Sequence, residues 1–285
     1  MSRTPLAAAL AALVGLGAIA ACAPGDSAQE TQTVVVTRAA PPPKPLRIIF
    51  PEGFTRKQMA ARITAVDEIA RKRRHVRPEL SEKTYLALTR RSKLPGRFAG
   101  DGRPRQLEGF LFPATYDFFA DTTTKDLVRK QLDAFRRAWS RVDLRYAKSK
   151  NLTPYDVLII ASMVEKEVVV PAERRLVAAV IYNRLHARMA LQIDATLRYG
   201  LDIPGTEPLH ESELESDNAY NTRIRPGLPP TPIANPGLAS IEAAANPARK
   251  NYLYFVRKPD KKHHFFTASE SEFFQKACEY GFGCG

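Results

Sequence analysis

The chain has 285 residues, of which 44% are hydrophobic and 26% charged, a composition that excludes wholesale disorder and allows a real core. Its formal net charge of +13 at pH 7 favours anionic partners such as nucleic acid, acidic lipid or an anionic cell-wall polymer. The sequence contains no C-x-x-C pair and no histidine cluster of metal-ligand spacing. We therefore predict no structural zinc, no other metal site and no cofactor.

Residues 1–22 are predicted to be a targeting segment. Arg3 is followed by a continuous apolar run, Leu6 to Ala21, which is typical of a secretory signal and short for a membrane span. The run ends in I-A-A-C, which resembles a bacterial lipobox and makes Cys22 a candidate lipidation site. The alternative is an uncleaved signal anchor with an incidental cysteine. Both interpretations place the bulk of the chain outside the cytoplasm, anchored to the bacterial cell membrane, with no nucleic-acid partner.

The segments that flank the predicted folded part are short and polar or glycine-rich. Residues 23–45 are predicted to be a proline-rich linker, because a polar run followed by Pro41 to Pro43 cannot bury enough apolar surface to fold. At the other end, Cys278 and Cys284 stand close together in a glycine-containing tail. An oxidising compartment permits a disulfide between them, and the alternative is two free thiols on a frayed tail.

Residues 46–100 are expected to form a small unit that docks on the part that follows, because it is too short for a substantial core of its own. Alternating apolar residues from Leu46 predict a short strand. Thr55, with Gln58 three positions later, has the signature of a capping box and predicts the start of a helix. A second helix is expected from about Ser81 to Leu94.

Residues 101–285 are predicted to form a larger domain of mixed helices and strands. Its first segment, Leu107 to Phe118, is rich in aromatic residues and includes Glu108 and Tyr116. Because apolar sugar faces stack on aromatic rings, a sugar-binding cleft is one interpretation. An ordinary strand and turn packed on the core is the other. A helix with one apolar face is predicted from about Thr124 to Val142.

The most informative stretch begins at Thr153. Together with Pro154 and Asp156, this residue marks the start of a helix that is apolar nearly all round and ends in the sequence E-K-E. Glu167 continues the apolar stripe of that helix. Burial should therefore raise the pKa of its carboxyl, as a general acid near neutral pH requires.

Glu165 lies on the adjoining face of the same helix, two residues before Glu167. The alternative to acid–base chemistry is that one or both carboxylates belong to a structural ion network. The basic residues that could complete such a network are Arg174, Arg175 and Arg184.

A second helix is predicted from near Pro171 to Leu185, with one apolar stripe. Gln192, Asp194 and Thr196 then stand at alternate positions, so in an extended segment they would share one face.

The last part of the chain combines a proline-rich stretch with two strands. The stretch from Gly227 to Gly237 predicts an ordered or functional loop. A strand is predicted over Tyr252 to Val256, and a partner strand containing His264 and Phe266 follows a turn.

Seven motifs, in this order, resemble the YceG-like endolytic murein transglycosylases over about Leu46 to Phe274. They are L-E-G-F-L-F-P-A-T-Y, A-S-M-V-E-K-E, Y-N-R-L, L-Q-I-D-A-T, Y-N-T, G-L-P-P-T-P-I-A-N-P-G and Y-L-Y-F-V with H-F-F. The resemblance implies an α+β fold in which a shortened, LysM-like subdomain precedes the catalytic domain. It also implies that Glu167 is catalytic, the residue that the helix-face argument selects independently.

The resemblance implies further site residues and partners. Residues expected to contact substrate are Glu108, Tyr116, Glu165, Gln192, Asp194, Thr196, Tyr220, Asn221, Asn235 and His264. The expected partners are peptidoglycan glycan strands and the synthases called penicillin-binding proteins. Departures from the family pattern at Ala114, Ile193, Ala195 and Arg223, and a late histidine missing near Phe273, affect details of the cleft.

The implied reaction cuts the β-1,4 bond between N-acetylmuramic acid and N-acetylglucosamine within strands, leaves 1,6-anhydro ends and terminates strand elongation. Glu167 would protonate the glycosidic oxygen and then deprotonate the 6-hydroxyl that attacks the anomeric carbon. One rival interpretation is a catalytically inactive, peptidoglycan-binding scaffold lipoprotein. The other is a basic extracytoplasmic protein that binds anionic polymers or DNA.

Overall fold

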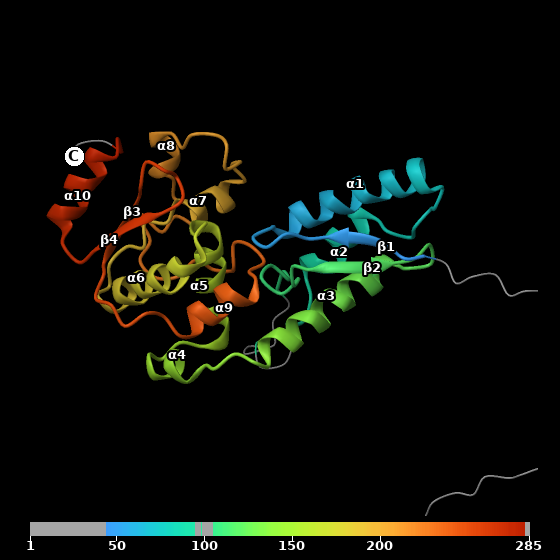
Figure 1. Ribbon diagram of the computed structural model, residues 1–285, viewed down its shortest axis with the longest axis horizontal. Coiled ribbons are helices and arrows are strands. Elements are labelled where there is room, and N and C mark those ends of the chain that lie inside the picture. The colour runs from blue at the N-terminus through green and yellow to red at the C-terminus, as the bar shows by residue number, and fades with distance from the viewer. Residues whose placement is uncertain (1–43, 95–97, 99–104, 283–285) are drawn as a thin grey trace, which may run out of the picture. The chain divides into compact units, whose positions relative to one another are not determined.

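The computed structural model of this chain describes residues 44–94, 98 and 105–282 (Figure 1). Helices dominate these residues, and the strands among them form two separate two-stranded antiparallel sheets. The predicted α+β class is therefore confirmed in this coarse form.

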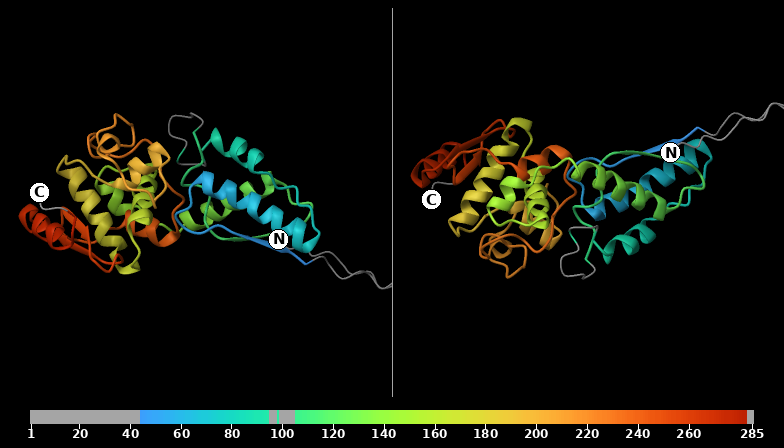
Figure 2. Two further views of the ribbon diagram at one scale, coloured as in Figure 1. Left: turned by 90° about the horizontal axis from the view of Figure 1, so that it is seen from above. Right: turned by 90° about the horizontal axis from the view of Figure 1, so that it is seen from below.

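The first elements form a strand pair flanked by helices. In chain order they are β1 (Leu46–Ile49), α1 (Arg56–Arg74), α2 (Glu82–Arg90), β2 (Thr115–Phe118) and α3 (Thr124–Trp139). β1 pairs with β2, α1 contacts β1 and α3 contacts β2, and α2 packs between α1 and α3 (Figures 1 and 2). Ile48, Tyr116 and Phe118 are buried and the residues that alternate with them are exposed, so one face of the strand pair is covered. The strand predicted at Leu46 thus finds its partner beyond residue 100, the boundary expected for the small unit. The expected LysM-like subdomain is not shown by this fold.

The predicted capping box begins α1. The backbone N–H of Gln58 donates to the Thr55 hydroxyl at 3.2 Å, and the backbone N–H of Thr55 donates to the Gln58 side chain at 2.9 Å. These bonds satisfy two of the donors that every helix N-terminus leaves unpaired. α2 and α3 are shorter than predicted, because the chain leaves helical geometry at Arg91 and after Ser140.

The remaining elements follow α3 in chain order. They are α4 (Arg145–Ser149), α5 (Pro154–Glu167), a 3-10 turn (Pro171–Glu173), α6 (Arg174–His186), α7 (Asp194–Leu201), α8 (Glu211–Leu214), α9 (Leu238–Ala245), β3 (Tyr254–Arg257), β4 (His264–Thr267) and α10 (Glu270–Glu279). α5 packs against both α6 and α9 (Figure 1), and every residue from Val157 to Val164 is buried. The prediction of a helix buried nearly all round, capped by Thr153 and ending at Glu167, is confirmed.

The segment that carries Gln192, Asp194 and Thr196 is not the predicted extended strand. Gln192 has a φ of 54°, in the left-handed region, and Asp194 is the first residue of α7. The three side chains therefore do not share one face. Thr196 is fully buried and bonded to Ile193 and Thr222, whereas the other two residues reach the surface.

The proline-rich stretch from Gly227 to Gly237 is an ordered loop, as predicted. The backbone N–H of Ile233 donates to the Ser162 hydroxyl of α5 at 3.0 Å. Pro232 lies so close to Gly109 that a Cβ atom there would be 2.7 Å from the proline ring, and Gly109 has a φ of +88°. Only glycine fits this position. Its missing side chain lets the aromatic segment pack directly against the proline-rich loop beside Leu158 of α5.

Several predictions concern the two ends of the chain. No helix in the described ranges is both long and apolar enough to cross a bilayer. The run from Leu6 to Ala21 and the candidate lipidation site Cys22 lie outside the described residues. Cys278 is disulfide-bonded. Its predicted partner, Cys284, lies outside the described residues, so that pairing stays a prediction.

Candidate active site

A cleft with a volume of about 1140 Å³ contains most of the candidate chemistry. Its walls come from the first turn of α1, the end of α5, residues 191–205, the β3–β4 hairpin and α10. Basic side chains outnumber acidic ones in this lining, which suits an anionic or polar polymer.

Glu167 lines this cleft at the last position of α5. The pKa of its carboxyl is raised to about 7, chiefly by burial; Arg257 and Lys166 act to lower it, and the nearby Asp194 carboxylate acts to raise it. None of the hydrogen bonds in the described part of the chain ends on this carboxylate, although part of the side chain faces solvent. A carboxyl that is half-protonated near pH 7 and has no protein donor can exchange a proton with a ligand.

The raised pKa has a consequence for stability. Because the folded pKa of Glu167 is about 7 and its usual value is 4.5, its favourable contribution is complete below about pH 4.5 and is lost as pH rises through 7. Glu167→Gln, which cannot ionise, should therefore stabilise the protein progressively more at pH 8 than at pH 4. Urea unfolding at pH 4, 6 and 8 measures this difference. The control is Glu68→Gln, the same exchange at an exposed position. If the change in the free energy of unfolding were independent of pH for both variants, the raised pKa of Glu167 would be contradicted.

A second carboxyl, Glu108, lines the same cleft but is held by donors on every side. It accepts two hydrogen bonds from the Arg56 backbone N–H at 2.9 and 3.1 Å, one from the Tyr199 hydroxyl at 3.1 Å and one from the Asn235 amide at 2.7 Å. Burial raises its pKa to about 7, and these bonds oppose the rise. Because every partner donates, Glu108 ties the start of α1 to α7 and to the proline-rich loop.

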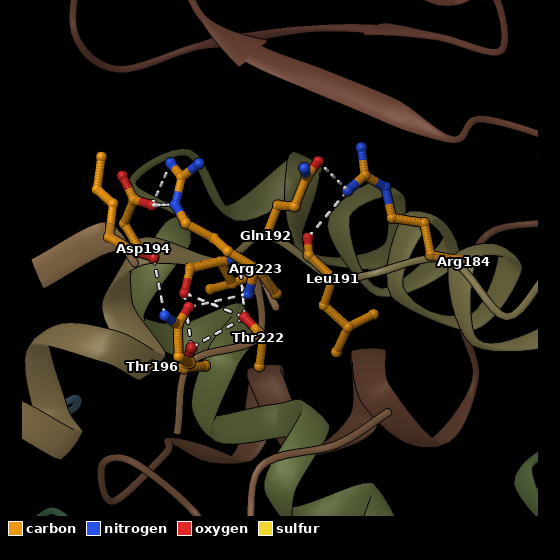
Figure 3. Close-up of polar contacts among 10 residues, drawn as sticks. Arg184, Leu191, Gln192, Asp194, Thr196, Thr222 and Arg223 are labelled. Carbon is orange, nitrogen blue, oxygen red and sulfur yellow. Dashed lines mark hydrogen bonds and ion pairs between the residues drawn. The ribbon is translucent and has the colours of Figure 1, made fainter. Parts of the chain in front are cut away.

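Two of the expected substrate residues are held by arginines at the cleft (Figure 3). Arg223 donates to Asp194 through Nε at 3.0 Å and Nη2 at 2.7 Å, and Arg184 donates to the Gln192 side-chain oxygen at 3.1 Å. Arg184 also donates to the Leu191 carbonyl at 3.1 Å, which anchors the left-handed turn at Gln192. These arginines leave one Asp194 oxygen available to a ligand.

Tyr220 and His264 also line the cleft. The Tyr220 hydroxyl bonds to Thr231 at 2.8 Å, and its ring meets Tyr199 edge-on with centroids 5.2 Å apart. His264 is 5% exposed, and its Nδ1 bonds to Glu173 at 2.7 Å, so a ligand would meet only the opposite edge of the imidazole ring.

The other expected substrate residues do not line the cleft. Glu165 accepts the Gly237 N–H at 3.0 Å and lies 4.0 Å from Arg174, which fits the structural ion pair considered as the alternative. The remaining four are buried and bonded within the protein. They are Tyr116, Thr196, Asn221 and Asn235. In this structure the five residues support the cleft walls from within, and their contact with substrate stays a prediction.

The model of the YceG-like family matches residues 23–279 of this chain. The chain belongs to the YceG-like family. It is 34% identical over 220 residues to a protein of Bacillus subtilis (strain 168) named endolytic murein transglycosylase, in a match that covers 74% of this chain and 59% of that protein. A relative of the same name from Streptococcus pneumoniae (strain ATCC BAA-255 / R6) is 34% identical over 186 residues, which cover 63% of this chain and 33% of that protein.

This YceG-like chain also resembles a solved structure. A 2.6 Å crystal structure of a YceG-like protein from Listeria monocytogenes matches it with a TM-score of 0.63 and 28% identity, over 79% of this chain and 74% of that one. The chain spans 59% of the length of the Bacillus relative and 33% of the streptococcal one.

Sequence reasoning missed several residues of this YceG-like cleft. Arg257, at the end of β3, lowers the pKa of Glu167, and Tyr199 connects α7 to Glu108. Neither carries a local signal, because their positions depend on how the hairpin and α7 pack. Arg184 was considered only as an ion partner of the two carboxylates, and its bonds to Leu191 and Gln192 were not expected. Among the described residues, no cluster of three or more His, Cys, Asp or Glu side chains could hold a metal ion.

Proposed function

We propose that this chain is an endolytic lytic transglycosylase of peptidoglycan. It would cut the β-1,4 bond between N-acetylmuramic acid and N-acetylglucosamine within a glycan strand and leave a 1,6-anhydro end. The observation that carries the proposal is Glu167, a carboxyl with a pKa of about 7 that receives no hydrogen bond from the described residues, in a cleft of about 1140 Å³. Membership of the YceG-like family and the names of the relatives support it.

The reaction needs only one protein carboxyl, because the substrate supplies the nucleophile. Glu167 in its acid form gives its proton to the glycosidic oxygen as the bond from that oxygen to the anomeric carbon breaks. The 6-hydroxyl oxygen of the same muramic acid then bonds to the anomeric carbon, and its proton returns to the Glu167 carboxylate. The enzyme ends in its starting state, and no water is consumed. A hydrolase would instead need a second carboxylate or an activated water.

The neighbours of Glu167 suit the remaining tasks. Asp194 keeps one oxygen free beside the cleft, where a negative charge stabilises an oxocarbenium-like transition state. Gln192, Tyr220 and the open edge of His264 offer polar atoms and a ring surface to the sugars. Glu108 serves the same cleft by holding Tyr199 and the first turn of α1 rather than by donating a proton.

The pH dependence of the rate tests the role of Arg257. Since the acid form of Glu167 starts the reaction, kcat/KM should fall as pH rises through about 7. Arg257 lowers this pKa, so Arg257→Gln should move the falling limb to higher pH, whatever it does to the maximal rate. Arg225→Gln, at an exposed arginine paired with Asp217 outside the cleft, should leave the limb in place. If the falling limb of kcat/KM in Arg257→Gln were unchanged or moved to lower pH, Arg257 would not be the residue that lowers the pKa of Glu167.

The product ends decide between reaction classes. Purified glycan strands would be incubated with the protein, and the fragments analysed by mass spectrometry. Internal fragments that end in 1,6-anhydro-muramic acid are expected. Reducing ends would identify a hydrolase and send the search to a second carboxylate, while binding without cleavage would favour the inactive scaffold.

Finer parts of the proposal concern the rest of the chain. Cleavage within growing strands would terminate their elongation, with penicillin-binding synthases as partners. Residues 46–100 would be the shortened LysM-like subdomain, whose strand β1 pairs with β2 beyond that range. Residues 1–22 would anchor the chain to the cell membrane with the catalytic part facing the wall, as their apolar run suggests.

A further inference from the structure

A row of aromatic side chains from α10 and β3 lines the cleft beside Arg184 and His264. Phe273 and Phe274 lie on α10, Phe282 follows that helix, and Tyr254 and Phe255 come from β3. We call these five residues the aromatic shelf. None of them was predicted to bind anything, and the proposed chemistry at Glu167 does not use them.

Two rings of the shelf are exposed to solvent. Phe274 is 50% exposed and Phe282 is 61% exposed, although both belong to the cleft lining. An exposed phenylalanine within a cleft leaves an apolar face that a ligand can cover, whereas a single exposed one on a convex surface needs no explanation. The pair is therefore a candidate binding surface.

Contacts with neighbouring side chains fix the rings of the shelf. Phe273 stacks on Tyr254 with centroids 5.3 Å apart and meets Phe274 edge-on at the same distance. The guanidinium of Arg184 lies 5.1 Å above the Tyr254 ring, on the side of the Gln192 turn. Since a rigid aromatic platform loses little conformational entropy when it binds, this support favours affinity.

Phe282 is placed by a helix cap. Gly281 adopts a φ of +84°, its N–H donates to the Cys278 carbonyl at 3.0 Å, and the N–H of Phe282 donates to the Ala277 carbonyl at 2.9 Å. This is the pattern of a Schellman motif, which fixes the residue after the glycine against the last turn of the helix. The disulfide at Cys278 constrains the same turn. The exposed ring therefore stands on a defined turn rather than on a frayed end.

We propose that the aromatic shelf is a sugar-binding subsite for N-acetylated pyranose rings of the same glycan strand, remote from the bond that Glu167 cuts. The inference rests on the proposed function, since the shelf and Glu167 share one cleft. The C–H faces of a pyranose ring pack on aromatic faces, and the extended strand continues past the reacting sugars. Although the cleft as a whole is basic, the Glu270 carboxylate accepts a hydrogen bond from the Tyr254 hydroxyl at 3.3 Å, and a negative charge at the shelf itself disfavours an anionic stem peptide there.

Binding is best measured in a Glu167→Gln background, where strands are not consumed. The probes are glycan strands of graded length with their stem peptides removed, and the same strands with stems attached. Phe274→Ala combined with Phe282→Ala should weaken the binding of long, stem-free strands about tenfold, and should leave short ones unchanged. Phe274→Tyr should retain affinity because it keeps the ring, whereas Phe274→Leu should not.

Phe119→Ala is the matched control, because Phe119 is 39% exposed and does not line the cleft. Melting temperatures verify that each variant folds. Unchanged affinity for long stem-free strands, a loss seen only with stem-bearing strands, or full affinity in Phe274→Leu would each overturn the subsite. If the wild-type enzyme gave reducing ends or no cleavage, the proposed transglycosylase reaction would be wrong. The binding data would still show whether the aromatic shelf binds glycan strands.

Discussion

Glu167→Gln is expected to lower kcat for strand cleavage by about 10²–10⁴-fold, the usual contribution of a general acid and base. The amide has almost the same shape as the carboxyl, but it cannot give a proton to the glycosidic oxygen or take one from the 6-hydroxyl. KM should change little, because no interaction with the ground-state substrate is removed. Release of 1,6-anhydro ends from purified strands, followed over time, measures the loss.

The control is Glu68→Gln, the same exchange on an exposed face of α1 outside the cleft. It should leave kcat unchanged. If Glu167→Gln kept wild-type turnover, Glu167 would not be the acid. Glu108 would then be the next carboxyl to replace, because it is the other group in the cleft with a pKa of about 7.

Asn235→Ala is expected to have the largest effect on stability, a loss of about 3–5 kcal/mol. The fully buried Asn235 amide accepts hydrogen bonds from the backbone N–H groups of Gly109 at 2.9 Å and Leu111 at 3.0 Å. It donates to the Phe54 carbonyl at 2.9 Å and to Glu108 at 2.7 Å. Alanine would leave two buried donors unsatisfied and remove a donor from a buried carboxyl.

Thermal unfolding should show this loss as a fall of about 10 °C in Tm. Asn246→Ala is the control, because Asn246 is exposed at the end of α9 and should shift Tm by less than about 2 °C. Similar melting of the two variants would mean that the Asn235 network is not the tie between the first turn of α1, the aromatic segment and the proline-rich loop.

Local signals in the sequence predicted the parts of the fold that local interactions determine. The capping boxes at Thr55 and Thr153 each begin a helix where they were expected. The position of Glu167 on the helical stripe predicted its raised pKa, because the three neighbouring turns of α5 are apolar and buried. A period of 3.6 residues carries this information without knowledge of the tertiary structure.

Other parts depended on distant contacts. The alternation of Gln192, Asp194 and Thr196 suggested one face of a strand, but Arg184 from α6 holds a left-handed turn there and α7 begins at Asp194. Asn221, like Thr196, lies in a matching motif although it is buried. A motif by itself therefore does not separate residues that touch substrate from residues that build the wall.

Arg257 shows the converse: a residue that acts on the catalytic carboxyl can lie outside every motif. It ends a short strand with no motif of its own, and only the packing of the β3–β4 hairpin brings its charge to Glu167. The exposed rings of Phe274, on α10, and Phe282, after it, were missed because exposure depends on the fold, and aromatic residues in a short helix are usually part of a core.

The pairing of β1 with β2 has a consequence for the order in which the chain folds. Arg47 and Asp117, which bond across the pair, are 70 positions apart in the chain. During synthesis β1 emerges before β2, which follows only after α1 and α2 have been made. Contacts between such distant segments form slowly, because a long loop must close first. Until then the edge of β1 is open to pairing with other chains, which makes this strand prone to aggregation while the chain is incomplete.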